Sequence, residues 1–257
     1  MGKEDEDDNF KPNGTILKRT VQIVGGKSEI INYEIGQNLR KGGGGGTCYL
    51  CRDAQTKEIF VVKEFPIDYL PEKERNLHQN LDHKNIVKIK DNFIENKKLY
   101  LLLEYCQNSD LSSLLKKRIK LKEIEVQYYI INLIEAVKYL HEKRIVHRDI
   151  KPSNIFLTDK LEVKLGDFGL SKEVSENEIM RDKYGTHGYM APEIYENKGY
   201  LFEVDIWAIG VIIYQLILGK MPFYGEDKDM ELKIKNVNYG FPKDAIISNA
   251  AKDLIKQ

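Results

Sequence analysis

The chain lacks an excess of either charge and contains few cysteines. Lys+Arg and Asp+Glu both total 40, so nothing indicates a general attraction to nucleic acid or to an anionic membrane. The three cysteines, Cys48, Cys51 and Cys106, cannot all pair with one another. The C-x-x-C spacing of Cys48 and Cys51 has neither the second pair nor the histidines that would complete a zinc site. Reduced thiols are therefore expected.

The chain also lacks long apolar runs and a secretion signal. Its N-terminus does not show the charged-then-apolar pattern of a signal peptide. The longest apolar run, residues 206–218, is shorter than a membrane span and contains Tyr214 and Gln215. These absences predict an intracellular protein, cytoplasmic or nuclear or both, without membrane insertion.

The first half of the chain has the pattern of a β-sheet. Residues 1–14 contain the acidic run Glu4–Asp8 and cannot bury much apolar area, which favours a disordered arm. From residue 16 to residue 62, short β-branched runs alternate with glycine-rich turns and predict strands. A short helix is expected within 71–81, followed by strands at 86–93 and 99–105.

After Tyr105 the apolar period becomes helical. Apolar residues between Val126 and Leu140 recur at helical spacing, and a nearly all-apolar helix is expected from about residue 203 to Leu218, ended by Gly219. Short strands are expected near 155–157 and 163–165. This order predicts an α+β fold with a sheet-rich small lobe (33–105), a larger helical lobe (106–257) and an N-terminal extension (1–32). Ligand sites are favoured at such a seam.

Three motifs carry the chemistry. They are His147-Arg148-Asp149-Ile150-Lys151-Pro152-Ser153-Asn154, then Asp167-Phe168-Gly169, then Ala191-Pro192-Glu193. In this order they resemble the catalytic set of protein kinases, H-R-D-x-K-x-x-N, D-F-G and A-P-E. Any one alone would equally suit a charged loop or a chance turn, whereas three in order make that interpretation remote. The resemblance implies the bilobal kinase fold, with a small antiparallel sheet and a larger helical lobe.

The roles of these residues follow from phosphoryl transfer, which needs positioning and charge neutralisation. Asp149 is expected to orient the substrate hydroxyl and accept its proton, and Lys151 to reach the transferring phosphate. Asn154 and Asp167 offer the oxygen ligands that Mg²⁺ prefers. The implied substrates are ATP and protein hydroxyls.

Lys63 ends the predicted strand Ile59–Val62, where kinases place the lysine that holds the α- and β-phosphates. By itself Lys63 would more readily be a solvated residue at a strand end, and the downstream motifs favour the functional role. Its expected partner is Glu74. Only ten residues separate Lys63 from Glu74, about two helical turns fewer than kinases usually carry, which predicts a truncated helix or absent residues.

The phosphate-covering loop is irregular. Counted forward from Leu39, Gly42 and Gly45 fit two of its glycines, while Arg40 replaces the first. Counted back from Lys63, Gly43 and Gly46 fit instead, with Cys48 at the usual valine position. We infer a one-residue insertion. A glycine run is otherwise typical of a flexible linker, but its place between two strands favours the loop.

Within the kinases, the chain from Tyr33 onward resembles the catalytic domain of polo-like cell-cycle kinases. The segments 161–170, 202–207 and 219–223 carry this likeness, together with Cys48 over the adenine and Phe156 beneath it. The resemblance implies that the substrates are serine and threonine rather than tyrosine residues, because Lys151 and Thr186 occur together. Its implied nucleotide contacts, besides Lys63 and the glycine loop, are Val61, Leu103 as gatekeeper, Glu104, Cys106 and Asp110.

One position departs from the polo-like pattern. The activation-loop threonine, whose phosphate would pair with Arg148, is replaced by Asp182. Asp182 is either a solvated loop residue, an engineered mimic, or a natural fixed charge that substitutes for the phosphate.

Two further expectations concern the whole protein. The chain ends at Gln257 before the last helices of a kinase lobe and before the arginine that usually pairs with Glu193, which predicts either that further residues follow or that the lobe is incomplete; any polo boxes would lie beyond Gln257. The alternatives are another serine/threonine kinase of the Aurora, NIMA-related or calcium-dependent group, or a pseudokinase that binds or scaffolds. A monomeric catalytic domain is expected.

Overall fold

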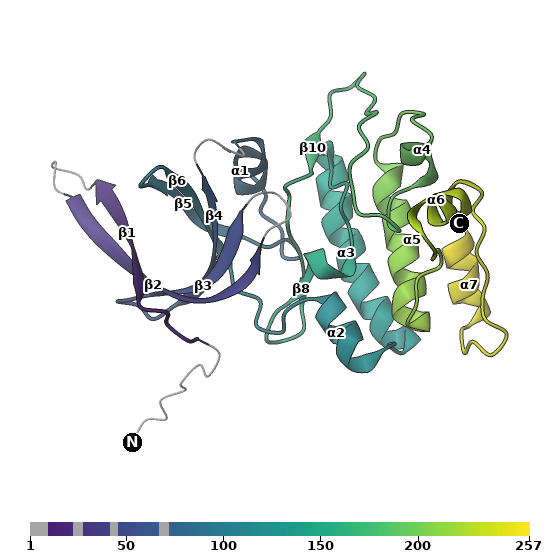
Figure 1. Ribbon diagram of the computed structural model, residues 1–257, viewed down its shortest axis with the longest axis horizontal. Helices are drawn as coiled ribbons and strands as arrows, with labels where there is room; N and C mark the ends of the chain where they lie inside the picture. The colour runs from purple at the N-terminus through teal and green to yellow at the C-terminus, as the bar shows by residue number, and fades with distance from the viewer. Residues whose placement is uncertain (1–9, 23–27, 42–45, 67–71) are drawn as a thin grey trace. The chain divides into compact units, whose positions relative to one another are not determined.

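The computed structural model describes residues 10–22, 28–41, 46–66 and 72–257 (Figure 1). Its strands are β1 (Thr15–Gln22), β2 (Ser28–Lys41), β3 (Thr47–Asp53), β4 (Ile59–Pro66), β5 (Ile89–Glu95), β6 (Lys98–Glu104), β7 (Ile145–Val146), β8 (Ile155–Leu157), β9 (Val163–Leu165) and β10 (Lys172–Glu173). Its helices are α1 (Glu72–Gln79), α2 (Leu111–Arg118), α3 (Glu123–Glu142), α4 (Pro192–Tyr195), α5 (Glu203–Leu218), α6 (Asp227–Lys235) and α7 (Asn249–Lys256), with a 3₁₀ turn at Pro152–Asn154.

The chain folds as two compact units. The first comprises residues 1–79 and 88–105, and the second residues 80–87 and 106–257. The sequence analysis placed residues 80–87 in the small lobe (33–105), but they belong to the second unit because they pair with β9. There Val87 N–H donates to Leu165 O (2.9 Å) and Leu165 N–H donates to Asn85 O (2.8 Å).

The first unit is built on a six-stranded antiparallel sheet in the order β1-β2-β3-β4-β6-β5. Side chains alternate between its two faces. One face carries a buried cluster that includes Leu17, Ile35, Val62 and Tyr100. The opposite face carries Phe65, Leu99 and Leu101. Because Lys63 lies between Val62 and Glu64, its side chain is on the Phe65 face, where Nζ sits 5.1 Å from the Phe65 ring centroid.

Strand β1 confirms the strand predicted from residue 16 onward, whereas residues 10–14 differ from the expectation of a disordered arm. Strand β1 pairs with β2 from Thr15↔Ile35 to Gln22↔Ser28. Residues 10–14, which the acidic composition favoured as a disordered arm, instead contact the sheet. Phe10 is buried beneath the Arg52 guanidinium, because one aromatic ring supplies apolar area that the acidic run lacks. Residues 1–9 lie outside the described residues.

The second unit is mainly helical, and α3 and α5 pack side by side in it (Figure 1). The apolar positions of α3 that recur at helical spacing are its buried face. Helix α5 is apolar on nearly all sides and ends at Gly219, whose φ of 71° is left-handed. The sheet-rich first unit and the helical second unit confirm the predicted α+β fold. No helix among the described residues combines the length and apolarity needed to cross a membrane.

Candidate active site

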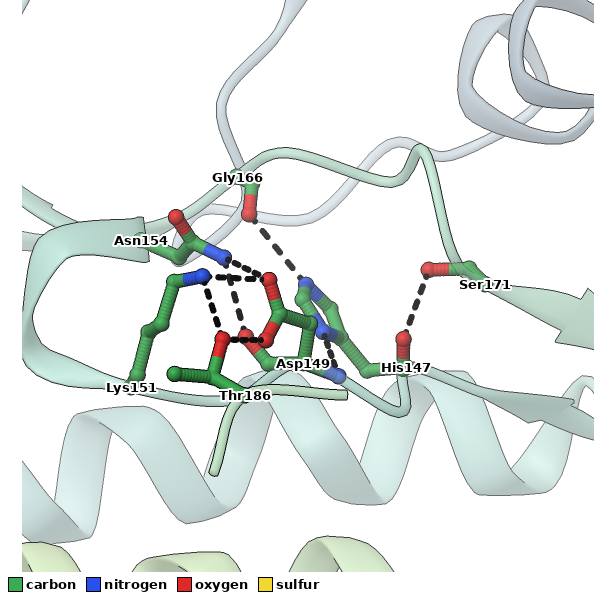
Figure 2. Close-up of polar contacts among 7 residues, drawn as sticks. All are labelled: His147, Asp149, Lys151, Asn154, Gly166, Ser171 and Thr186. Atoms are coloured by element: carbon green, nitrogen blue, oxygen red, sulfur yellow. Dashed lines mark hydrogen bonds and ion pairs between the residues drawn. The ribbon is translucent and has the colours of Figure 1, made fainter. Parts of the chain in front are cut away.

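The predicted catalytic residues form one hydrogen-bonded cluster in the second unit (Figure 2). Asp149 follows β7, and both of its carboxylate oxygens are engaged. Oδ1 accepts from Thr186 Oγ1 (2.6 Å) and Oδ2 accepts from Lys151 Nζ (2.7 Å). Lys151 Nζ also donates to Thr186 Oγ1 (2.6 Å). Thr186, which follows far along the chain, is therefore held against the catalytic loop, as the resemblance implied.

Asn154 completes this cluster and leaves one oxygen available. Its side-chain amide Nδ2 donates to Asp149 O (2.9 Å) and Oδ2 (3.1 Å). The residue is fully buried, yet Oδ1 has no hydrogen-bond partner among the described residues. A buried orphan acceptor is costly unless it has a ligand. An amide oxygen of this kind beside the Asp149 carboxylate suits a hard divalent cation such as Mg²⁺.

The Asp-Phe-Gly segment starts directly after β9. Asp167 has a left-handed φ of 62°, a conformation that costs energy for a non-glycine residue and is typical of functional loops. Gly166 N–H donates to Asn154 O (3.0 Å), which ties this segment to the catalytic loop. Phe168 is buried, with its ring 5.2 Å from that of His147.

The Asp205 carboxylate binds the backbone of the catalytic loop. This carboxylate is 1% exposed in α5. It accepts the backbone N–H of His147 (Oδ2, 2.9 Å) and of Arg148 (Oδ1, 3.0 Å), and Oδ2 lies 2.9 Å from His141 Nε2. The loop backbone that presents Asp149 is thus fixed by a buried acid.

Arg148 and Asp182 lie close to each other. Arg148 Nη1 is 3.6 Å from Asp182 Oδ2 and has no hydrogen-bond partner among the described residues. Arg148 Nε donates to Leu170 O (2.5 Å), and the guanidinium lies over the Tyr184 ring. Tyr200 Oη donates to Asp182 O (2.7 Å), and burial raises the pKa of Tyr200. The loop that carries Asp182 is therefore tied down by two contacts.

Glu193 of the Ala-Pro-Glu motif has no cationic partner among the residues that the structure describes. Burial, with Glu203 and Glu196 nearby, raises the pKa of its carboxyl. The expected arginine partner stays a prediction.

The first unit contains several of the residues expected to contact the nucleotide. Cys48 of β3 pairs with Lys63 of β4, and Val61 pairs with Leu103 of β6. Lys63 is 7% exposed. Glu104 N–H donates to Lys88 O (2.9 Å), and its carboxylate accepts from Lys88 N–H (3.2 Å). The antiparallel register thus brings Cys48, Lys63, Val61 and Leu103 onto adjacent strands.

Only part of the glycine loop can be located. Leu39 is exposed near the end of β2, and Gly46 is buried, where an added Cβ would lie 2.7 Å from the Phe65 ring. Gly42, Gly43 and Gly45 lie outside the described residues. Glu74 lies in α1, and its expected ion pair with Lys63 stays a prediction.

The second unit contains the remaining residues expected near the nucleotide. Asp110 caps α2, since its Oδ1 accepts from Ser113 N–H (2.8 Å), and its backbone bridges to Phe156 of β8. Cys106 is buried, and its carbonyl accepts from Ser109 N–H (3.2 Å). Cys106, Asp110 and Phe156 are thus close neighbours in the fold.

Sequence reasoning assigned no positioning role to Asp205 or His141. The available signal was an acid within a nearly all-apolar helix, which is rarely buried without partners.

The comparisons with known proteins agree with this geometry. The family described as "Protein kinase domain" matches residues 33–257. The chain is 40% identical over 223 residues to serine/threonine-protein kinase polo of Drosophila melanogaster, covering 83% of this chain and 38% of that protein. It is 40% identical over 236 residues to serine/threonine-protein kinase plk-2 of Caenorhabditis elegans (87% and 36%). It is also 40% identical over 239 residues to the cell cycle serine/threonine-protein kinase CDC5/MSD2 of Saccharomyces cerevisiae (88% and 33%).

The chain spans only 24% to 40% of the lengths of the first curated relatives that it matches. The likeness therefore concerns their shared catalytic region, where the Asp149 cluster lies. Because the family match covers most of the chain and the cluster has the residues of the kinase catalytic loop, this chain belongs to the protein kinase family and resembles its polo-like serine/threonine members.

Proposed function

We propose that this chain is a polo-like serine/threonine protein kinase that transfers the γ-phosphate of ATP to hydroxyls of protein substrates. The observation that carries the proposal is the Asp149–Lys151–Thr186 triangle, in which each pair of side chains is hydrogen-bonded. An aspartate held in this way is oriented before the substrate arrives, so little reorganisation is needed during the reaction.

In this mechanism the substrate hydroxyl approaches the Asp149 carboxylate. As its oxygen attacks the γ-phosphorus, the bond to the β,γ-bridging oxygen breaks and ADP leaves, while the hydroxyl proton passes to Asp149. Lys151 lies 2.7 Å from that carboxylate and can stabilise charge on the transferring group. Thr186 holds both side chains in place.

Asn154 and Asp167 would hold Mg²⁺. The bare, buried Oδ1 of Asn154 supports this assignment. When bound, the metal would neutralise phosphate charge. The other proposed nucleotide contacts are Lys63, Glu74, Val61, Cys48, Leu39 and the glycines of the loop, with Leu103, Glu104, Cys106 and Phe156 near the base and Asp110 near the ribose.

Regulation by Asp182 is part of the proposal. Its carboxylate lies 3.6 Å from Arg148, which supports a fixed charge in place of a phosphate. A carboxylate has less charge and fewer acceptor oxygens than a phosphate. We therefore expect basal activity without an upstream kinase. By likeness to polo-like kinases we also propose an intracellular, monomeric catalytic domain.

The test is a transfer assay with ATP·Mg²⁺ and peptides that offer only serine, threonine or tyrosine. Label on serine and threonine peptides is expected, and its loss in Lys63→Met would assign it to this chain. Label on tyrosine alone would refute the acceptor assignment. Nucleotide binding without any transfer would favour the pseudokinase alternative.

A further inference from the structure

The three most exposed of the large apolar side chains that the structure describes lie at one end of the second unit. Ile246 is 88% exposed, Ile119 73% and Ile124 70%. Ile119 follows α2, Ile124 is in the first turn of α3 and Ile246 precedes α7, and these segments lie along the lower edge of this unit in Figure 1. Single exposed apolar residues are ordinary, but a group of them marks an interaction surface.

Two hydrogen bonds tie these segments to one another and to α5. Leu121 N–H, in the α2–α3 connection, donates to Leu216 O (2.8 Å) near the C-terminal end of α5. Ser248 N–H, at the N-cap of α7, donates to Glu123 Oε1 (2.6 Å) at the start of α3. The three isoleucines therefore belong to one packed end of the unit and not to independent loops.

Positively charged side chains surround Ile119. Four exposed lysines without an ion pair to any described residue are Lys116, Lys117, Lys120 and Lys220. Lys220 is close because Gly219 packs against Ile119, whose carbonyl oxygen lies 2.7 Å from the position of a Gly219 Cβ. The helix dipole accounts for the two lysines in the last turn of α2, but not for Lys120 and Lys220.

This end of the unit has a local excess of positive charge. Residues 116–125, 219–220 and 243–248 contain six lysines and one arginine against three acids, Glu123, Glu125 and Asp244. Glu125 is moreover paired with Arg118 (2.5 Å). The zero net charge of the whole chain had indicated no general attraction to an anionic surface, because a sum does not show where the charges lie. An anionic partner is therefore favoured here.

The backbone and the exposure of Ile119 indicate what kind of anionic partner fits. Its φ of 64° is unfavourable for a β-branched residue, and such strain is typical of functional positions. A side chain that is 70% exposed or more protrudes, so it does not line a concave groove. Protruding aliphatic residues among lysines suit a bilayer interface, which takes up apolar side chains and presents anionic headgroups.

We propose that this end of the second unit binds the surface of an anionic lipid bilayer. The three isoleucines enter the headgroup region, and the lysines around them contact the anionic headgroups. A nucleic acid or an acidic peptide would attract the same lysines but would leave the isoleucines unused. The proposal goes beyond the proposed kinase activity and requires no residue of the Asp149 cluster.

The test is flotation of the unmodified chain with two kinds of vesicle, phosphatidylcholine alone and phosphatidylcholine mixed with phosphatidylserine. Binding is expected mainly to the mixed vesicles and should weaken as salt is added. Equal binding to both kinds of vesicle, or binding to neither, would overturn the proposal.

Matched charge variants locate the surface. Lys117→Gln combined with Lys120→Gln should weaken binding to the mixed vesicles about 30-fold, because each lysine near the bilayer contributes about fivefold. Lys84→Gln combined with Lys160→Gln removes the same charge at exposed positions elsewhere in the second unit and should leave binding unchanged. Equal effects of the two pairs would overturn the proposed location.

Ile119→Asn separates the apolar contribution from the charge. Asparagine tolerates a positive φ better than isoleucine, so the variant should fold, and Ile246→Asn is a second variant that does not depend on this position. Each should weaken vesicle binding about tenfold and keep the same dependence on salt. Unchanged binding in both variants would overturn the lipid assignment. Binding to soluble polyglutamate as strong as to the mixed vesicles would also overturn it and would indicate an acidic peptide partner.

Discussion

The hydroxyl of Thr186 gives the most informative single substitution, because it makes two contacts in the cluster. It donates to Asp149 Oδ1 and accepts from Lys151 Nζ, both at 2.6 Å. Thr186→Val has nearly the same shape and removes both bonds. Asp149 Oδ1 is then left without this donor, and Lys151 is held by Asp149 alone.

The expected loss follows from the charges involved. A hydrogen bond to a charged group contributes about 1.5–3 kcal/mol. If this stabilisation is needed in the transition state, kcat should fall roughly 10- to 150-fold. Thr186→Ser keeps the hydroxyl and should stay within about threefold of the unmodified chain. Nucleotide affinity should change little in either variant, since Thr186 acts on the acceptor side.

The assay is steady-state phosphorylation of a serine peptide, with thermal unfolding as the check on folding. Equal kcat values for the valine and unmodified chains would refute the role of this hydroxyl. Equal losses in the valine and serine variants would show that shape matters rather than hydrogen bonding.

Three further predictions test other parts of the account. Asp167→Asn should weaken Mg²⁺-dependent ATP binding and slow transfer together, with partial rescue by added Mg²⁺; calorimetry showing no dependence on Mg²⁺ would contradict the metal assignment. Asp182→Asn should lower basal activity about 1.4- to 5-fold, because a half-exposed ion pair contributes about 0.2–1 kcal/mol; equal activities of the phosphatase-treated variant and the phosphatase-treated unmodified chain would refute it. Glu193→Gln should raise the unfolding temperature at neutral pH relative to Glu176→Gln, which changes an exposed carboxylate. The pKa of Glu193 is higher in the folded chain than in the unfolded chain. The stability of the unmodified chain therefore falls as the pH rises from the unfolded-state pKa through the folded-state pKa, and identical pH profiles for the two variants would contradict this.

The catalytic loop was predictable because its chemistry lies within a few residues of sequence. Asp149, Lys151 and Asn154 are placed by one loop and one 3₁₀ turn, so their order along the chain nearly determines their contacts. The contact of Thr186 with this loop followed only from resemblance, since nothing local in the sequence brings it to Asp149.

Long-range packing accounts for what sequence reasoning missed. The role of Asp205 depends on α5 lying beneath the catalytic loop, and a single acid in an apolar helix does not reveal which backbone it will bind. The contacts of residues 10–14 depend on Phe10 reaching the sheet near Gly36, which composition does not predict. The short helices α2, α4, α6 and α7 were not predicted, because each spans nine residues or fewer, which is shorter than the window over which an apolar period is recognised.

The central claim is that Asp149 acts on the substrate hydroxyl, and Asp149→Asn tests it most directly. The amide has nearly the same shape but cannot take the proton, and loss of a general base costs about 10²- to 10⁴-fold in rate. The decisive measurement is the turnover of Asp149→Asn with ATP·Mg²⁺ and a serine peptide, together with its nucleotide affinity. The account predicts that turnover falls by a factor of about 10² or more, while the nucleotide affinity stays nearly unchanged. Turnover equal to that of the unmodified chain would contradict it.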